Sequence, residues 1–181
     1  MDQVDIHTQV SSRKALDDFV TQCKLEFPEE VAQLFENYTR VIWQHKCPGI
    51  IHKFYCDETI CYGEGGRKVI GADIIVAGTL GFMRSFPERI CDFVDIFAEG
   101  NEKDGYSFGQ ATRFNATNTG YSKFGPPTGK TLQRDGEYCH SICECRVEKV
   151  EGRWRIVEEW VVESSEAINE TLQFGPEENL E

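Results

Sequence analysis

Four long segments of β-type sequence, separated by short turns, fill the second half of the chain. These segments are ICDFVDIFAEG, YSFGQATRFNATNTG, EYCHSICECRVEKV and RWRIVEEWVVE. Their β-branched and aromatic residues favour strands, and the Gly, Asn and Asp residues between them favour turns. The break at Glu151-Gly152 is short enough for a hairpin. The sequence therefore predicts an antiparallel meander after Pro87.

The first half of the chain shows helical periodicity instead, with apolar residues three and four positions apart. The elements predicted around the strands are a helix from Ser11, a helix from Pro28 to about Pro48, two short extended pieces within residues 50–62 around a turn at Asp57-Glu58, a helix from Gly71 to Phe86, and a last helix from Ser164 to Leu172. Helices followed by one antiparallel sheet form the α+β pattern, with the helices on one face of a curved sheet. The concave face of such a sheet favours a small-molecule cavity.

Charge and hydropathy narrow the classes of partner. The 181 residues carry a formal net charge of −12, with 31 acidic and 19 basic side chains. Such a chain repels phosphate backbones, so we expect no nucleic-acid partner. No apolar run reaches the roughly 18 residues of a membrane helix, and the N-terminal residues lack the pattern of a secretory signal. We therefore expect a cytoplasmic protein with no membrane partner.

Eight cysteines raise the question of disulfides and metals. Disulfide scaffolds are usually short secreted chains, so reduced thiols are expected here. Cys139, Cys143 and Cys145 alternate onto one face of a predicted strand. Ligands two apart on a strand are roughly 6.5–7 Å apart at Cα, which suits tetrahedral coordination poorly. We interpret these thiols as small buried side chains and expect no metal site.

Three groups of motifs resemble a known family. They are Gly71 followed by a helix that ends in Ser85-Phe86-Pro87-Glu88, then Thr117-Asn118-Thr119-Gly120 with Gly125-Pro126-Pro127-Thr128-Gly129-Lys130, and Ile156-Val157-Glu158-Glu159-Trp160-Val161-Val162 before the last helix. Over residues 35–175 this pattern is similar to the SnoaL-like branch of the nuclear transport factor 2-like superfamily, which includes polyketide cyclases and ketosteroid isomerases.

The resemblance implies a cone-shaped, curved antiparallel sheet packed against N-terminal helices, the cystatin-like arrangement. It further implies a homodimer whose interior holds a small hydrophobic molecule with a carbonyl group, with no metal or organic cofactor. On this basis residues 1–27 are expected to form a helical extension, residues 28–175 the SnoaL-like domain, and residues 176–181 a frayed tail.

Two positions depart from the cyclase pattern. Cyclases of this branch carry an acidic residue about three places before an Arg in the next-to-last strand, and alignment on Arg146 puts Cys143 there. Many relatives have His where this chain has Asn118. A neutral amide cannot shuttle the protons of an aldol closure, although it can hydrogen-bond a carbonyl oxygen. We therefore do not assign the cyclase mechanism to this chain directly from the resemblance.

Strand parity supplies other candidates. If the last strand keeps its two-residue period, Glu158 lies beside Trp160 on one face. A carboxyl group desolvated by an indole ring is a usable acid or base, so Glu158 is the predicted catalytic residue. A structural carboxylate paired with Arg is the alternative. The predicted ligand-binding residues are Tyr62, Phe114, Asn118, Cys143 and Trp160.

Two classes of function remain open on the sequence. One is a small-molecule pocket protein, either a lyase, isomerase or cyclase acting next to a carbonyl or a non-catalytic binder. The other is an interaction module whose open sheet face forms a dimer or docks a partner. Exposed apolar residues on that face would favour the second class.

Overall fold

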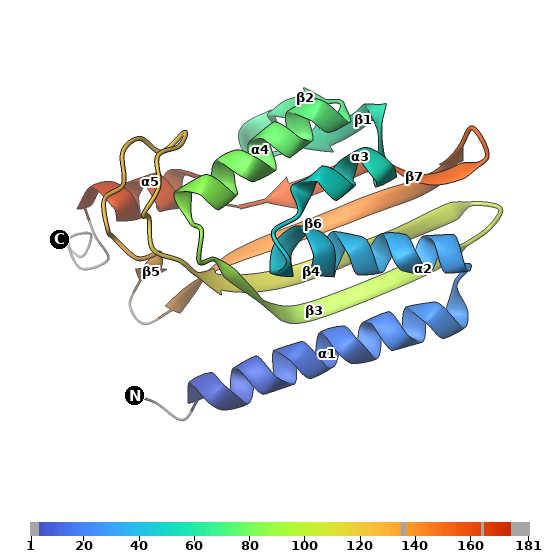
Figure 1. Cartoon of the computed structure of the whole chain (residues 1–181), viewed down its shortest axis with the longest axis horizontal. Helices are drawn as coiled ribbons and strands as arrows, with labels where there is room; N and C mark the ends of the chain where they lie inside the picture. Colours follow the sequence, from blue (N-terminus) through green and yellow to red (C-terminus); the bar gives the residue numbers. More distant parts are fainter. Residues whose placement is uncertain (1–3, 135–136, 164, 175–181) are drawn as a thin grey trace.

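The long strands of the second half of the chain form one curved sheet, and helices pack against it (Figure 1). The computed structural model describes residues 4–134, 137–163 and 165–174. Its strands are β1 (Tyr55–Tyr62), β2 (Lys68–Ile70), β3 (Ile90–Asn101), β4 (Gly105–Asn115), β5 (Gln133–Arg134), β6 (Glu137–Val150) and β7 (Arg153–Val162). The helices are α1 (Val4–Glu26), α2 (Glu29–Glu36), η1 (Asn37–Gln44), η2 (Pro48–Ile50), α3 (Ile51–Phe54), η3 (Glu64–Gly66), α4 (Ala72–Ser85) and α5 (Ser165–Phe174).

The predicted meander is confirmed. The strand order is β2-β1-β7-β6-β4-β3, with β5 paired to β6. Strands β3, β4, β6 and β7 pair antiparallel in sequence order. Glu151 and Gly152 have φ angles of 50° and 78°, which suit a two-residue hairpin turn between β6 and β7. One pairing departs from the antiparallel expectation, because β1 runs parallel to β7.

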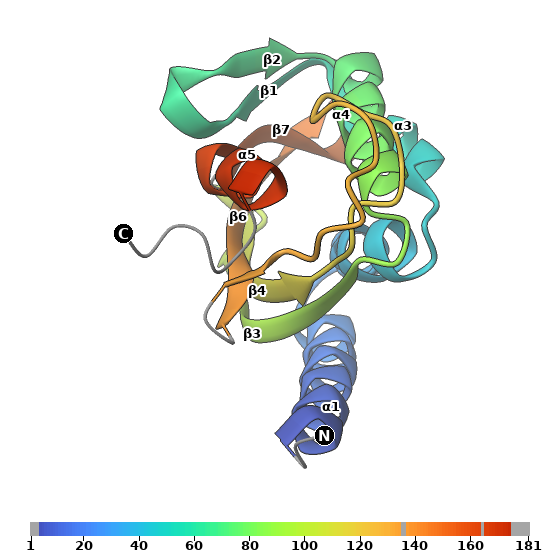
Figure 2. The same ribbon diagram turned by 90° about the vertical axis from the view of Figure 1, so that its left-hand side faces the viewer.

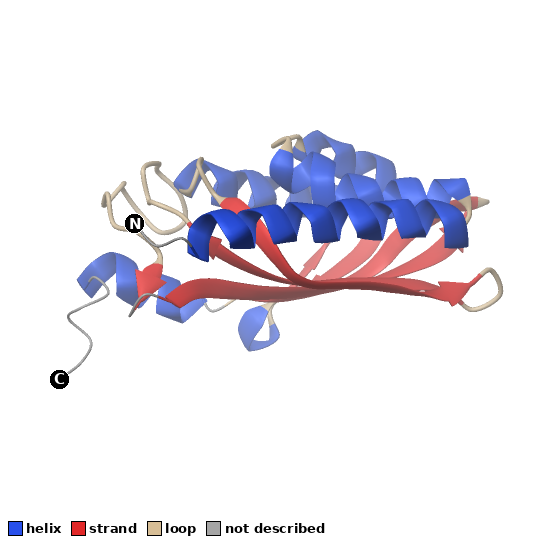
Figure 3. Ribbon diagram, turned by 90° about the horizontal axis from the view of Figure 1, so that it is seen from below, coloured by secondary structure: helices blue, strands red, loops and turns tan. Residues whose placement is uncertain are grey.

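Helices α1 to α4 lie on one face of the sheet, whereas α5 lies at one end of it, an arrangement of the α+β class (Figure 1). Viewed end-on, the strands curl from β2 to β3, and α4 lies across the open side (Figure 2). Figure 3 shows the helical layer on the hollow side of the sheet. The main core lies between the two layers, where Phe35 of α2 and Phe108 of β4 are fully buried with ring centroids 4.7 Å apart. Burial of such rings is the main favourable contribution to folding.

The second predicted helix continues as a π-helix, η1. The backbone N–H of His45 donates to the carbonyl oxygen of Arg40, five residues back, at 3.0 Å. The side chains of Tyr38 and Trp43, both in this helix, line the cavity described below. π-Helical turns inside helices often occur at functional sites.

Two element boundaries differ from the prediction. α1 begins at Val4 rather than Ser11, because no Gly or Pro separates the preceding residues from the helix. Residues 50–54 were expected to be extended but lie in η2 and α3, since Pro48 suits the first turn of a helix. The strand begins only at Tyr55, and its pairing is irregular between Tyr55 and Ile60, where the turn was predicted. The expected tail, residues 176–181, lies outside the described residues.

The N-terminal helix is attached through the edge of the sheet. Leu16 and Val20 of α1 form a small buried cluster with Phe93 of β3. None of the described helices is long and apolar enough to span a membrane.

Candidate functional site

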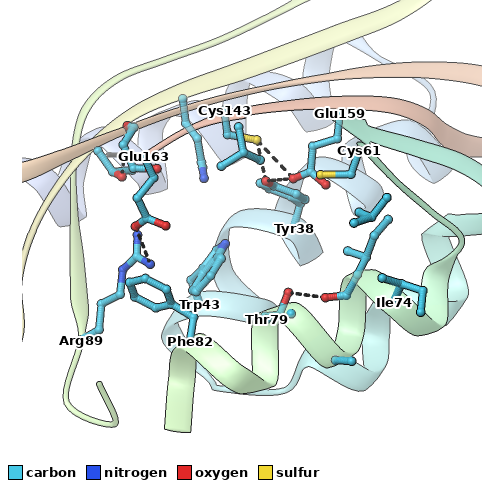
Figure 4. A pocket seen from close by; sticks show the side chains of 18 of the residues that line it. Tyr38, Trp43, Cys61, Ile74, Thr79, Phe82, Arg89, Cys143, Glu159 and Glu163 are labelled. Carbon is cyan, nitrogen blue, oxygen red and sulfur yellow. Dashed lines mark hydrogen bonds and ion pairs between the residues drawn. The ribbon is translucent and has the colours of Figure 1, made fainter. Parts of the chain in front are cut away.

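A cavity of about 440 Å³ opens between α4 and the concave face of the sheet (Figure 4). Its α4 wall is largely apolar and includes Ile74, Ile75 and Phe82. Its sheet wall is polar and includes Gln110, Thr112, Ser141, Cys143, Glu159 and Glu163. An apolar cavity of this size with a few convergent polar groups is typical of a small-molecule site.

Glu159 of β7 lies at one end of the cavity, where it is only 5% exposed. The Tyr38 hydroxyl donates to its Oε1 at 2.7 Å, and the Tyr55 hydroxyl donates to its Oε2 at 3.1 Å. The Cys143 thiol lies 3.4 Å from Oε1 and donates to it as well. Among the described residues, Glu159 has no Lys, Arg or His partner within ion-pair distance. A buried carboxylate is thus held by neutral donors alone.

A β-bulge in β7 determines which carboxylate faces the cavity. Ile156 pairs with Val147 and Glu158 with Arg146, so Val157 is the extra residue. An extra residue shifts every later side chain to the opposite face. Ile156 and Glu159 therefore share the inner face although they are three positions apart.

Burial keeps the donors around Glu159 protonated. Removal from water raises the pKa of Tyr38 and the pKa of Tyr55 well above the ordinary value. It also raises the pKa of the Cys143 and Cys145 thiols, and the charge of Glu159 acts in the same direction. All four groups therefore stay neutral near pH 7, and Tyr38, Tyr55 and Cys143 donate hydrogen bonds to the carboxylate.

Cys143, Cys145 and Glu159 bring their ligand atoms within 4.8 Å of one another, a spacing that a soft metal could use. Two observations oppose that use. A metal would have to displace protons from two thiols whose burial favours the protonated form. It would also compete with the tyrosine hydroxyls that occupy both carboxylate oxygens. The donor set thus fits a hydrogen-bonded carboxylate better than a metal centre.

Arg89 and Glu163 form an ion pair at the other end of the cavity, as Figure 4 shows, with Arg89 Nη1 and Glu163 Oε1 3.4 Å apart. The guanidinium carbon lies 4.7, 4.4 and 3.9 Å from the ring centroids of Trp43, Phe82 and Phe114. Burial raises the pKa of Glu163, while the charge of Arg89 partly offsets that rise. The aromatic rings keep the guanidinium in place through cation–π contacts.

Three cross-strand residue pairs form the sheet wall between the two ends of the cavity. Cys145 is the neighbour of Glu159, Cys143 is opposite Gln110, and Ser141 is opposite Thr112. Gln110 is buried, and its Oε1 has no hydrogen-bond partner among the described residues. A buried acceptor of this kind costs free energy unless a ligand or water satisfies it.

Three of the sequence-predicted residues lie on the outer face of the sheet. Glu158 is half-buried there and pairs with Arg146, with Oε2 and Nη1 3.6 Å apart. Trp160 is 39% exposed and stacks on Tyr62 at 5.6 Å between ring centroids. The expected parity fails because of the bulge at Val157. Glu158 thus takes the structural arrangement that was the alternative on the sequence.

The other predicted residues face inward, but only Cys143 lines the cavity. Phe114 is buried outside the cavity lining, and its ring contacts the guanidinium of Arg89. Asn118 is fully buried in a loop: its amide donates to the backbone oxygens of Ser85 and Gly120, and its Oδ1 accepts from the N–H of Thr128. Asn118 therefore fixes the loop and does not reach the cavity.

Sequence reasoning missed Glu159, Tyr38 and Arg89. Tyr38 falls on the apolar stripe of a predicted helix and resembles a core residue in pattern. Arg89 follows Pro87-Glu88 in what looks like a surface turn. The one available signal was the pair of adjacent carboxylates, Glu158 and Glu159, of which one must face inward on a strand.

Neither a protein-family model nor a curated protein sequence matches the chain. Solved structures do match. A nuclear transport factor 2-like protein with a cystatin-like fold from Novosphingobium aromaticivorans superposes with a TM-score of 0.53 and 13% identity, over 87% of this chain and 96% of that chain. The chain has the nuclear transport factor 2-like fold.

Two further structures with this fold are similar to the chain. A proposed SnoaL-like polyketide cyclase from Jannaschia has a TM-score of 0.59 and 14% identity, over 81% of this chain and 95% of that chain. AclR, a proposed hydroxylase from Streptomyces galilaeus, has a TM-score of 0.57 and 24% identity, over 77% of this chain and 92% of that chain. These likenesses confirm the predicted nuclear transport factor 2-like fold, and the neighbours differ in the reactions proposed for them.

Proposed function

We propose that this protein transfers protons at a carbon atom next to a carbonyl group of a small hydrophobic molecule, with Glu159 as the acid/base residue. The single observation that carries the proposal is the buried Glu159 carboxylate, which faces an apolar cavity and is held by neutral donors only. One fold supports many reactions, so the argument rests on this site rather than on the structural neighbours.

The site contains the groups that such a reaction needs. Glu159 Oε takes the proton of the C–H bond, and the bonding electrons move onto the carbonyl oxygen to give an enolate. The polar floor, including Gln110 and Ser141, offers hydrogen bonds to that oxygen. In a substrate with a carbon–carbon double bond conjugated to the enolate, return of the proton from Glu159 to the far carbon of the dienolate moves the double bond and isomerises the molecule, so no oxidant or reductant is consumed. The apolar α4 wall excludes water, which strengthens these interactions.

Tyr38 and Tyr55 position the base. Each hydroxyl group fixes one carboxylate oxygen, which limits rotation of the side chain. A base that is held in one orientation needs less reorganisation during proton transfer.

Deuterium exchange tests the proposal without knowledge of the natural substrate. The probe is 2-tetralone, a bicyclic ketone with an acidic C–H bond next to its carbonyl, incubated in D₂O and followed by NMR. We expect the native protein to catalyse exchange at that carbon and Glu159→Gln to lower the rate by about 10²–10⁴-fold.

Glu158→Gln is the matched control, because it makes the same chemical change one residue away on the outer face. We expect its exchange rate to equal that of the native protein. If Glu158→Gln lowered the exchange rate and Glu159→Gln did not, Glu158 would be the acid/base residue instead. Binding of 2-tetralone without any catalysed exchange would contradict the proposed enzymatic activity and would favour a non-catalytic ligand-binding protein.

A dimer interface is the second candidate role, and the outer face of the sheet favours it. Ile142 and Val162 are cross-strand partners there and are 57% and 61% exposed. They adjoin the Tyr62–Trp160 stack. An apolar patch of this kind is typical of a protein interface. This role is compatible with a functional cavity on the other face.

A further inference from the structure

The charges in the cavity are arranged asymmetrically along its length. Glu159 is the charged group at one end, whereas Arg89, Glu163 and Lys123 meet at the other. Within the described part of the chain, Lys123 forms no ion pair, and its ammonium lies 4.8 Å from the centroid of the Phe124 ring. Its charge also acts on Glu163 and opposes the rise of that carboxyl group's pKa. Among the cavity-lining residues, two cations therefore face one carboxylate at this end, and Glu64, which lies outside the lining, also acts on Glu163.

Unsatisfied polar atoms also gather in this cavity. Arg89 Nε, Glu163 Oε1 and Gln110 Oε1 are buried without hydrogen-bond partners in the part of the chain that the structure describes. Arg89 has five N–H donors, and its pairing with Glu163 does not satisfy Nε. Buried polar groups are nearly always satisfied in native proteins, so the Arg89 Nε donor points to an acceptor group on a ligand, whereas the two carbonyl-type oxygens require a donor such as water.

The two ends are separated by a fixed length of strand. Glu159 and Glu163 are four residues apart near the end of β7, which corresponds to roughly 13 Å at about 3.3 Å per residue. A ligand of two fused rings with a substituent at each end has about this length. The cavity volume of about 440 Å³ is sufficient for such a molecule.

We propose that the cavity is built for an anionic ligand: a flat hydrophobic molecule whose carboxylate group is held at the Arg89–Lys123 end while its carbonyl group lies at Glu159. This inference rests on the proposed function for the orientation of the ligand, and the binding of the anion can be tested independently. Lys123 supplies a positive charge that is in no ion pair among the described residues. The guanidinium of Arg89 is suited to carboxylates because its donors are planar and rigid.

A cationic or neutral ligand fits this end less well. A cation would face Arg89 and Lys123, and Glu163 is the only carboxylate at this end that lines the cavity. A neutral ligand would give the buried Arg89 guanidinium no charged partner besides Glu163. The chain's net charge of −12 repels anions elsewhere on the surface, so selective binding of an anion would have to come from these local cations.

The test compares two isosteric probes, 2-tetralone with a carboxylate on its aromatic ring and the same compound with a carboxamide. Dissociation constants are measured by titration calorimetry. We expect the carboxylate to bind up to about fivefold more tightly to the native protein, because it gains a charge-assisted contact that solvent weakens at the exposed Lys123. Lys123→Gln should abolish this preference, and Lys123→Arg should retain it.

Lys103→Gln is the matched control, since Lys103 lies in the β3–β4 turn, away from the cavity lining, and carries the same charge. It should leave the preference unchanged. Equal or tighter binding of the carboxamide by the native protein would overturn the inference, as would a preference that survives Lys123→Gln. Glu159→Gln separates the two proposals, because it should abolish deuterium exchange while the carboxylate preference persists.

Discussion

The hydroxyl group of Tyr38 donates a hydrogen bond to Oε1 of Glu159 at 2.7 Å, although 121 positions separate the two residues in the sequence. The bond joins the π-helix η1 to β7 beneath the cavity. It therefore couples the helical layer to the residue proposed as the base.

Tyr38→Phe removes this bond and keeps the ring. The Glu159 carboxylate then loses one of its donors in a buried site, which costs about 1.5–3 kcal/mol for a bond to a charged group. We expect urea unfolding to show that the unfolding free energy of Tyr38→Phe is lower by this amount. Tyr121→Phe is the control, because Tyr121 is exposed. Equal stability of Tyr38→Phe and the native protein would show that the bond contributes nothing.

Glu163 makes stability depend on pH. Burial raises its pKa above the ordinary value of 4.5. The folded protein therefore holds this proton more tightly than the unfolded chain does. The contribution of protonated Glu163 to the unfolding free energy is fully present below pH 4.5 and is lost as the pH rises through the folded-state pKa.

Glu163→Gln cannot lose a proton, so it lacks this dependence. We expect the unfolding free energy of the native protein, minus that of Glu163→Gln, to decrease as the pH rises through this window. Denaturant unfolding at a series of pH values measures the difference. An increase with pH would mean that the ion pair with Arg89 dominates over burial.

Thiol reactivity should follow burial. The seven cysteines whose side chains are described are all free, and the side chain of Cys91 lies outside that set. Cys47 is exposed, whereas burial raises the pKa of Cys143 and of Cys145. Because the thiolate is the reactive form, we expect Ellman's reagent to modify Cys47 rapidly and the buried pair only on unfolding. In denaturant all eight thiols should react, and a count near zero would contradict the expected reducing compartment.

The apolar outer face predicts a homodimer. We expect sedimentation to give twice the chain mass of 20.7 kDa. Ile142→Glu should produce monomers, because it introduces a charge into the proposed interface. Leu80→Glu is the control on α4, where Leu80 is similarly exposed. A native monomer, or dissociation by Leu80→Glu alone, would exclude the sheet face as the interface.

The sequence was informative where a pattern is local. Strand segments, the hairpin at Glu151-Gly152 and the helix before Pro87 depend on nearby residues and were predicted from them. Cys143 was placed correctly on the inner face, because β6 keeps its two-residue period there. The extra residue Val157 has no local signature, since β-branched residues suit both regular strands and bulges.

The remaining site residues depend on long-range packing. Tyr38 of η1 reaches Glu159 across 121 positions of the chain, and neither residue identifies the other in sequence. Arg89 is buried because three aromatic rings from separate elements surround it. Tertiary contacts of this kind cannot be read from spacing alone.

A crystal structure of Glu159→Gln with 2-tetralone tests the central claim most directly, since we expect this variant to bind the ketone without turnover. We predict that the ketone lies between α4 and the sheet, with the carbon next to its carbonyl about 3–3.5 Å from the side-chain amide that replaces the carboxylate at position 159. A ketone bound on the outer face beside Glu158, or a carbonyl directed away from position 159, would contradict the account.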